Sequence, residues 1–161
     1  MDRWDILNKK KTEDFHDLMD AQWGAHIPGD YQYLFSGQDK LYIVHKDVAK
    51  IDFRKLRIDS MGLYVGEYRK KQLRLSIEGS QLVGPKATKN VVTVDKDGAI
   101  KWLRGEDLIV EDYTPLGKET PTGFVIIRWN DDYLGTGKMK DGAILNHVPK
   151  ARRLLTSDVS N

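Results

Sequence analysis

The sequence predicts an α+β protein in which an N-terminal helix-containing segment packs on a small β-barrel. An amphipathic pattern near the start indicates a helix, and from about residue 57 short β-forming runs alternate with turn signals. The 161 residues are 40% hydrophobic, which suits one domain or a lead-in segment plus a compact module. We expect an α/β segment at 1–60, the barrel at 61–155 and a flexible tail at 156–161.

The N-terminal segment is predicted to hold one clear helix, at residues 12–23. Apolar and amphipathic side chains recur there at helical spacing, at Phe15, Leu18, Met19 and Gln22. Strands are expected at 31–35 and 41–44, with turn-forming residues around them. Asp47 has the character of an N-cap, so a short helix is expected after it, carrying Val48, Ile51 and Leu56.

The second part of the chain is predicted to be built from short strands. Glycines punctuate a β-rich run at 61–67, and apolar residues alternate with polar ones at 72–77, as in a half-buried strand. Asp95–Gly98 has hairpin-turn chemistry and is expected to join strands at 91–94 and 100–103. Further turns and strands are expected at Asn130–Asp132 between 124–129 and 133–138, and at Asp141–Gly142 before 143–145.

Composition excludes several classes of site. The chain has no cysteine, which rules out disulfides, cysteine-ligated zinc or iron–sulfur sites and a cysteine nucleophile. Its longest apolar runs, Leu41–Val44 and Phe124–Ile127, fall far short of the roughly 20 residues of a membrane-spanning helix. We therefore expect a soluble, cytoplasmic protein with no membrane partner.

The sequence offers no motif for catalysis, so we predict no enzyme activity, no cofactor and no metal. The four histidines lack the spacing that places two imidazoles on one helix face. Gly135–Lys138 contains a G-x-G and a lysine but lacks the spacing of a phosphate-binding loop, and no G-x-S-x-G is present. A Ser/His/Asp triad stays open, because its members meet only in the fold.

Charge is segregated along the chain although the formal net charge is only +2. Residues 67–75 hold four Lys/Arg against one Glu, and residues 138–153 hold five Lys/Arg against one Asp. Residues 105–119 hold five Asp/Glu against one Lys. A folded molecule with a basic face and an acidic edge is expected, and clustered Lys/Arg indicates a polyanionic partner.

Five segments, taken in order, carry the most specific signal. They are Gly62-Leu63-Tyr64-Val65-Gly66-Glu67 followed by basic residues, Trp102-Leu103-Arg104-Gly105-Glu106, a hydrophobic strand, Leu134-Gly135-Thr136-Gly137-Lys138, and Asn146-His147-Val148-Pro149-Lys150 with Arg153. Over about residues 31–155 the chain resembles the PUA-like RNA-binding domain at the C-terminus of Sun/Fmu-type ribosomal RNA cytosine-5 methyltransferases. It is also similar to stand-alone archaeal PUA-domain proteins of ribosome biogenesis. Leu145 departs from the pattern, where the family often has lysine.

The resemblance implies RNA binding without methyl transfer. Methylation at carbon 5 of cytosine needs a cysteine thiolate that adds to the base, and the chain has none. It implies an accessory protein for rRNA or tRNA modification or ribosome biogenesis, with structured RNA as its partner. The expected RNA-binding residues are Lys138, Lys140, Asn146, His147, Lys150, Arg152, Arg153, Arg69, Lys70 and Lys71.

The residue types fit such a role. Lysine and arginine neutralise phosphates, and Asn146 and His147 can hydrogen-bond base or sugar edges. Gly135 and Gly137 would let an RNA backbone approach the strand. Tyr64, Tyr68 and Trp129 are candidates for base stacking, although aromatic residues of small barrels more often lie in the core.

Two rival functions stay open. The chain can instead be an adaptor, in which the N-terminal segment and the acidic residues 105–119 dock an RNA-modification enzyme or a ribosome-assembly factor. The second rival is a small hydrolase or nucleobase-modifying enzyme that uses His147 with a carboxylate.

Overall fold

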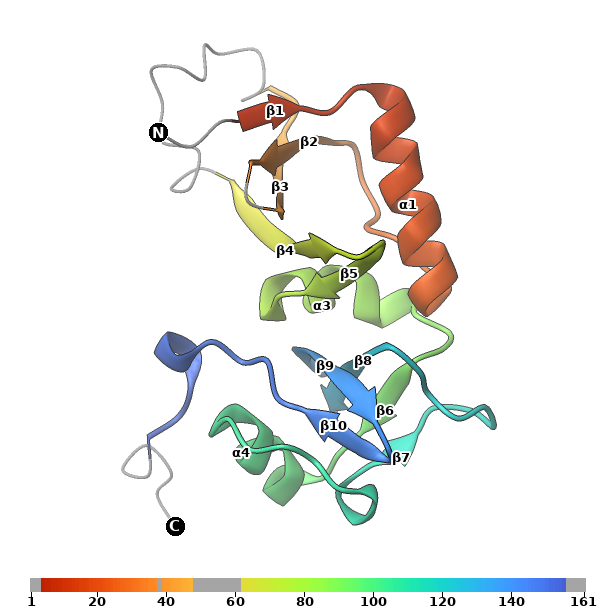
Figure 1. Cartoon of the computed structure of the whole chain (residues 1–161), viewed down its shortest axis with the longest axis vertical. Coiled ribbons are helices and arrows are strands. Elements are labelled where there is room, and N and C mark those ends of the chain that lie inside the picture. The colour runs from red at the N-terminus through yellow and green to blue at the C-terminus, as the bar shows by residue number, and fades with distance from the viewer. Residues whose placement is uncertain (1–3, 38, 48–61, 156–161) are drawn as a thin grey trace.

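The computed structural model describes residues 4–37, 39–47 and 62–155. Within them two five-stranded sheets lie one above the other in Figure 1. The first sheet has the order β1-β2-β3-β4-β5 and is antiparallel throughout, with bounds Trp4–Ile6, Tyr31–Ser36, Lys40–His45, Leu63–Arg69 and Gln72–Leu75. The second has the order β10-β9-β8-β6-β7, with bounds Ala143–Leu145, Asp132–Lys140, Phe124–Trp129, Val91–Thr93 and Thr114–Pro115. The predicted α+β class is confirmed.

Helix α1 (Lys9–Trp23) flanks the first sheet, as Figure 1 shows. It begins where the Asn8 side chain accepts a hydrogen bond from the Lys11 amide, and it ends at Gly24 in the left-handed region with φ 73°. Met19 and Trp23 are fully buried against the sheet. Trp23 also donates from Nε1 to the Phe124 carbonyl at 3.0 Å, so the end of α1 is fixed to the second sheet.

Helix α3 (Ile77–Val83) lies between the two sheets (Figure 1). It starts directly after β5, because Ser76 caps it by accepting from the Gly79 amide at 2.9 Å. The strand predicted at 72–77 therefore ends two residues earlier than expected, and Ile77 is the first helical residue. The Ser80 hydroxyl accepts from the Gly135 amide at 2.8 Å, which ties α3 to β9.

The hairpin predicted around Asp95–Gly98 is wrong. Asp95 caps helix α4 (Lys96–Leu103) by accepting from the Gly98 amide at 2.8 Å. Ala99 and Trp102 form its buried face, and Trp102 is fully enclosed. Because residues 100–103 are helical, β6 has no hairpin partner there; it pairs antiparallel with β7 on one side and runs parallel to β8 on the other.

The remaining local predictions fare better. The 12–23 helix, the strands at 31–35 and 41–44, and the β8–β9 and β9–β10 hairpins are present near their expected bounds. Asn130 and Asp141 take positive φ values of 54° and 52° in the two turns, as turn chemistry requires.

Three expectations have other outcomes. The helix expected after Asp47 and the tail at 156–161 lie outside the described residues. The predicted boundary between domains 1–60 and 61–155 falls within the first sheet, whose last two strands, β4 and β5, come after it. The division near residue 60 stays a prediction.

Candidate nucleic-acid interface

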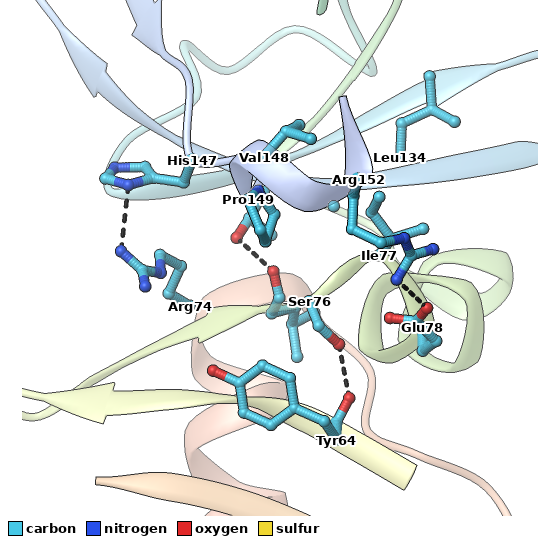
Figure 2. Close-up of a pocket in the computed structure, with 13 residues that line it drawn as sticks. Tyr64, Arg74, Ser76, Ile77, Glu78, Leu134, His147, Val148, Pro149 and Arg152 are labelled. Atoms are coloured by element: carbon cyan, nitrogen blue, oxygen red, sulfur yellow. Dashed lines mark hydrogen bonds and ion pairs between the residues drawn. The ribbon is translucent and has the colours of Figure 1, made fainter. Parts of the chain in front are cut away.

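The fold brings the two basic segments of the sequence together. Lys138 on β9 donates from Nζ to Oε1 of Gln72 on β5 at 3.1 Å. Arg74 on the same strand contacts His147 Nδ1 at 3.1 Å, as Figure 2 shows. Segments 67–75 and 138–153 therefore contact each other at the junction of the two sheets.

A small cleft of about 90 Å³ lies at this junction. Its walls come from β4, β5 and α3 on one side and from β9 and the segment after β10 on the other. The lining residues that Figure 2 labels are Tyr64, Arg74, Ser76, Ile77, Glu78, Leu134, His147, Val148, Pro149 and Arg152. The cleft is open to solvent and has room for ordered water.

One end of the cleft is closed by the contact between Arg74 and His147. A guanidinium can only donate, so His147 Nδ1 accepts and its proton resides on Nε2. Burial, followed by the neighbouring Arg74 charge, lowers the pKa of His147 below its ordinary value. Arg74 also pairs with Glu67 at 2.7 Å, so its charge is partly compensated.

At the other end Arg152 forms an ion pair with Glu78 at the start of α3 (Figure 2). Tyr64 faces the same cleft, and burial together with Glu67 raises the pKa of its hydroxyl to about 12. The tyrosine is therefore a neutral hydrogen-bond donor at physiological pH.

Four of the five expected lysines are exposed. Lys70 and Lys71 form the β4–β5 turn with φ values of 50° and 63° and are exposed. Lys140 at the end of β9 and Lys150 after Pro149 are exposed as well. Lys138 is half-buried, with its ammonium 4.9 Å from the centre of the Phe124 ring.

Arg69 differs from these lysines because carboxylates hold it. It pairs with Glu67 at 2.7 Å and with Asp39 at 3.5 Å. The guanidinium of Arg69 is therefore partly neutralised by its own neighbours.

Asn146 has a structural role that its sequence motif did not reveal. Its side-chain amide donates to the carbonyls of Trp102 at 2.7 Å and Glu106 at 2.9 Å, and accepts from the Val148 amide at 2.8 Å. Both N–H donors are thus used inside the protein, and the expected contact of Asn146 with RNA has no free donor to make it.

Arg153 is similarly turned toward the protein. Its Nε donates to the Val148 carbonyl at 3.0 Å, and its guanidinium lies against Gly105. A Cβ on Gly105 would come within 2.5 Å of that Nε, so the glycine makes room for the arginine.

The expected role of Gly137 in admitting an RNA backbone is wrong. Gly137 is buried, and a Cβ there would collide with the Trp102 ring and lie 2.6 Å from the Leu145 carbonyl oxygen. Gly137 makes room for the core tryptophan and for β10. Gly135 lines the cleft but is buried too.

The candidate stacking residues are mostly packed inside. Tyr68 makes edge contacts with Phe15 and Phe35, and Trp129 is half-buried against the second core. Of the three, Tyr64 lines the cleft.

Sequence reasoning missed Gln72 and Glu78, and it named Arg74 only as part of a basic run. Gln72 and Glu78 carry no motif, and their partners Lys138 and Arg152 are 66 and 74 residues away along the chain. Only the tertiary structure shows their role.

The hydrolase hypothesis gains no support from the environment of His147. The polar partner of its ring is Arg74 rather than a carboxylate. Among the described residues, no three His, Cys, Asp or Glu side chains gather as a metal site. No helix in the same ranges is long and apolar enough to cross a membrane.

Comparison with known proteins is consistent with this architecture. Residues 89–154 match the family model for the methyltransferase RsmF PUA domain. Ribosomal RNA small subunit methyltransferase F of Aeromonas salmonicida is 30% identical over 144 residues, covering 89% of this chain and 28% of that protein. The enzyme of the same name from Vibrio parahaemolyticus is 22% identical over 143 residues, covering 89% and 29%. The chain thus spans less than a third of these curated relatives.

Solved structures show the same fold. A conserved PUA domain protein from Thermoplasma acidophilum superposes with a TM-score of 0.54 at 15% identity, covering 92% of this chain and 95% of that one. A PUA domain from Aeropyrum pernix K1 gives a TM-score of 0.51 at 13% identity, covering 85% and 72%. The chain therefore has a PUA-like fold, and its residues 89–154 resemble the methyltransferase RsmF PUA domain.

Proposed function

We propose that this chain is an RNA-binding module that serves ribosomal RNA modification. The observation that carries the proposal is the union of two basic segments, 67–75 and 138–153, through the Gln72–Lys138 and Arg74–His147 contacts. Together the segments hold nine Lys/Arg against one Glu and one Asp. A concentrated positive surface of this kind is the electrostatic footprint of a phosphate backbone.

The proposed target is a structured ribosomal RNA. The curated relatives are named as methyltransferases of small-subunit ribosomal RNA, and the match lies in the part that this chain shares with them. In a wider form of the same proposal, the module supplies RNA affinity for transfer RNA modification or for ribosome assembly.

We propose that these residues bind RNA and leave methyl transfer to another polypeptide segment. The 161 residues contain no cysteine, so they lack the thiolate that adds to cytosine during methylation at carbon 5. The module would then act by holding the RNA while a catalytic domain acts on the base.

Binding to a folded rRNA fragment across a salt series tests the proposal. Lys140 and Lys150 are the best positions to change, because both are exposed. Replacing both with alanine should weaken binding and make the salt slope shallower by up to about 2, since each phosphate contact contributes about 0.9.

Lys9 and Lys11 provide the matched control. They are equally exposed and lie in the first turn of α1, at the far end of the molecule from β9 and β10 (Figure 1). If the Lys9→Ala/Lys11→Ala variant loses as much affinity for RNA as the Lys140→Ala/Lys150→Ala variant, the binding is unspecific charge attraction. Absence of binding by the wild-type chain at low salt would overturn the proposal.

A protein-docking role is the second candidate, favoured by one observation. Ile109 and Val110 are 50% and 60% exposed and lie within the acidic stretch 105–119. Adjacent exposed apolar residues with an acidic surround suit a basic protein partner. A complex that survives nuclease and high salt, and is lost in Ile109→Ser/Val110→Ser, would support this function.

A further inference from the structure

A second cavity lies on the proposed RNA-binding surface, separate from the cleft of Figure 2. It is open to solvent and has a volume of about 320 Å³, where the end of α1 meets β5, the start of β8 and the end of β9. Its lining residues are Ala21, Gln22, Gln72, Asn90, Thr122, Gly123, Phe124 and Lys138. It borders both basic segments, through Gln72 of β5 and Lys138 of β9.

The wall of this cavity is held rigidly by side chains that bond to backbone. Gln22 donates to the Leu73 carbonyl at 2.9 Å and accepts from the Leu73 amide at 2.8 Å. Asn90 donates to the Gln22 carbonyl at 2.5 Å and accepts from the Thr122 amide at 3.0 Å. The cavity is therefore preformed, and a ligand would not have to order it.

Two side chains present N–H donors to the cavity. An ammonium can only donate, so the contact of Lys138 with Gln72 fixes the orientation of the amide, with Oε1 toward the lysine. Gln72 Nε2 then points elsewhere, and a Cβ on Gly123 would lie 3.8 Å from it. Within the described part of the chain this nitrogen has no hydrogen-bond acceptor.

The charge of the cavity favours an anion. Lys138 lines it, and Lys71 precedes Gln72 in the adjoining turn. Among the described residues that line it there is no carboxylate, whereas Glu78 lines the cleft. Unused N–H donors beside an ammonium suit the oxygens of a phosphate group.

We propose that this cavity binds one phosphate group of the RNA backbone, with Lys138 and the Nε2 of Gln72 as its donors. The inference rests on the proposed function and names a particular subsite within it. The cavity is larger than one phosphate, so it also admits the ribose attached to it. Phe124 supplies an apolar wall for that sugar.

Lys138→Met is the main test, and Lys140→Met is its matched control. Both residues lie on β9 two positions apart, so they share a face of the strand, but only Lys138 lines the cavity. We expect affinity for a folded rRNA fragment to fall about tenfold for Lys138→Met and about two- to threefold for Lys140→Met.

Gln72→Glu provides a second variant that keeps an acceptor for Lys138 while it removes both N–H donors. Its affinity should fall at least as far as that of Lys138→Met. The NMR signals of the Gln72 side-chain amide in the wild-type protein provide a direct readout. They should shift with a short oligonucleotide, and inorganic phosphate at the same concentration should shift them less, because it lacks the neighbouring phosphates and sugar.

The possible failures are distinguishable. One outcome is that the wild-type protein binds RNA, Lys138→Met and Lys140→Met lose affinity equally, and the Gln72 amide signal does not move. That outcome would overturn the subsite and leave the proposed function standing. An equal response to inorganic phosphate and to the oligonucleotide would show a site for free phosphate rather than for RNA. Absence of RNA binding by the wild-type protein would overturn the proposed function itself.

Discussion

Replacing Asn146 with alanine should destabilise the protein rather than weaken its contact with RNA. The substitution removes three hydrogen bonds, to the Trp102 and Glu106 carbonyls and from the Val148 amide. At about 0.5–1.5 kcal/mol each, their loss lowers the free energy of unfolding by about 2–4 kcal/mol. In a chain of this size that corresponds to a fall in Tm of about 5–15 °C.

Urea denaturation followed by far-UV circular dichroism measures this change. Lys150→Ala is the matched control, because Lys150 is exposed on the same segment and should change stability by less than about 0.5 kcal/mol. Wild-type stability of Asn146→Ala together with a fall in its affinity for RNA would contradict this prediction. That result would return Asn146 to the RNA-binding surface.

Three further predictions follow from the contacts of the cleft and the core. Gly137→Ala should lower the free energy of unfolding by at least about 1–3 kcal/mol in urea denaturation, because the added methyl collides with Trp102. Glu78→Gln frees Arg152 from its ion pair, so affinity for RNA in a fluorescence anisotropy titration at low salt should rise about two- to fivefold; unchanged affinity would count against Arg152 as a phosphate contact. The pKa of His147 in the folded state is lowered below 6.5, so the unfolded chain binds this proton more tightly. The stability that neutral His147 contributes is present above pH 6.5 and is lost as the pH falls through the folded-state pKa. Urea denaturation at several pH values across that window should show that the free energy of unfolding depends less steeply on pH in His147→Gln than in the wild type.

Much of the local structure was predictable because its signals are local. The β8–β9 and β9–β10 hairpins follow from turn residues that lie between β-forming runs, at Asn130 and Asp141. Helix α1 follows from apolar spacing within its own 15 residues. Such elements are specified by neighbours in the sequence.

The region around Asp95 shows where local signals fail. Aspartate and glycine three residues apart suit both a hairpin turn and a helix start, and residues 99–103 are apolar enough for either. The parallel pairing of β6 with β8 accompanies the helical outcome, and β8 begins more than 30 residues further along the chain. No window around Asp95 contains that information.

Some features of the candidate site are likewise predictable from the sequence, and others depend on tertiary contacts. The positively charged character of the surface follows from composition, since lysine and arginine side chains stay near water wherever the fold puts them. The packing roles of Asn146 and Gly137 depend on Trp102, which is 44 residues from Asn146 along the chain, so the local motif does not reveal them. Sequence motifs identified the segment that matters but not which of its side chains face outward.

Mapping protein–RNA cross-links tests the central claim most directly. The wild-type protein would be bound to an rRNA fragment that carries 4-thiouridine, irradiated, digested and analysed by mass spectrometry. We predict cross-links in the β4–β5 hairpin and in residues 138–152, on the two sides of the sheet junction. Cross-links confined to the first turn of α1 or to the acidic stretch 105–119 would contradict it.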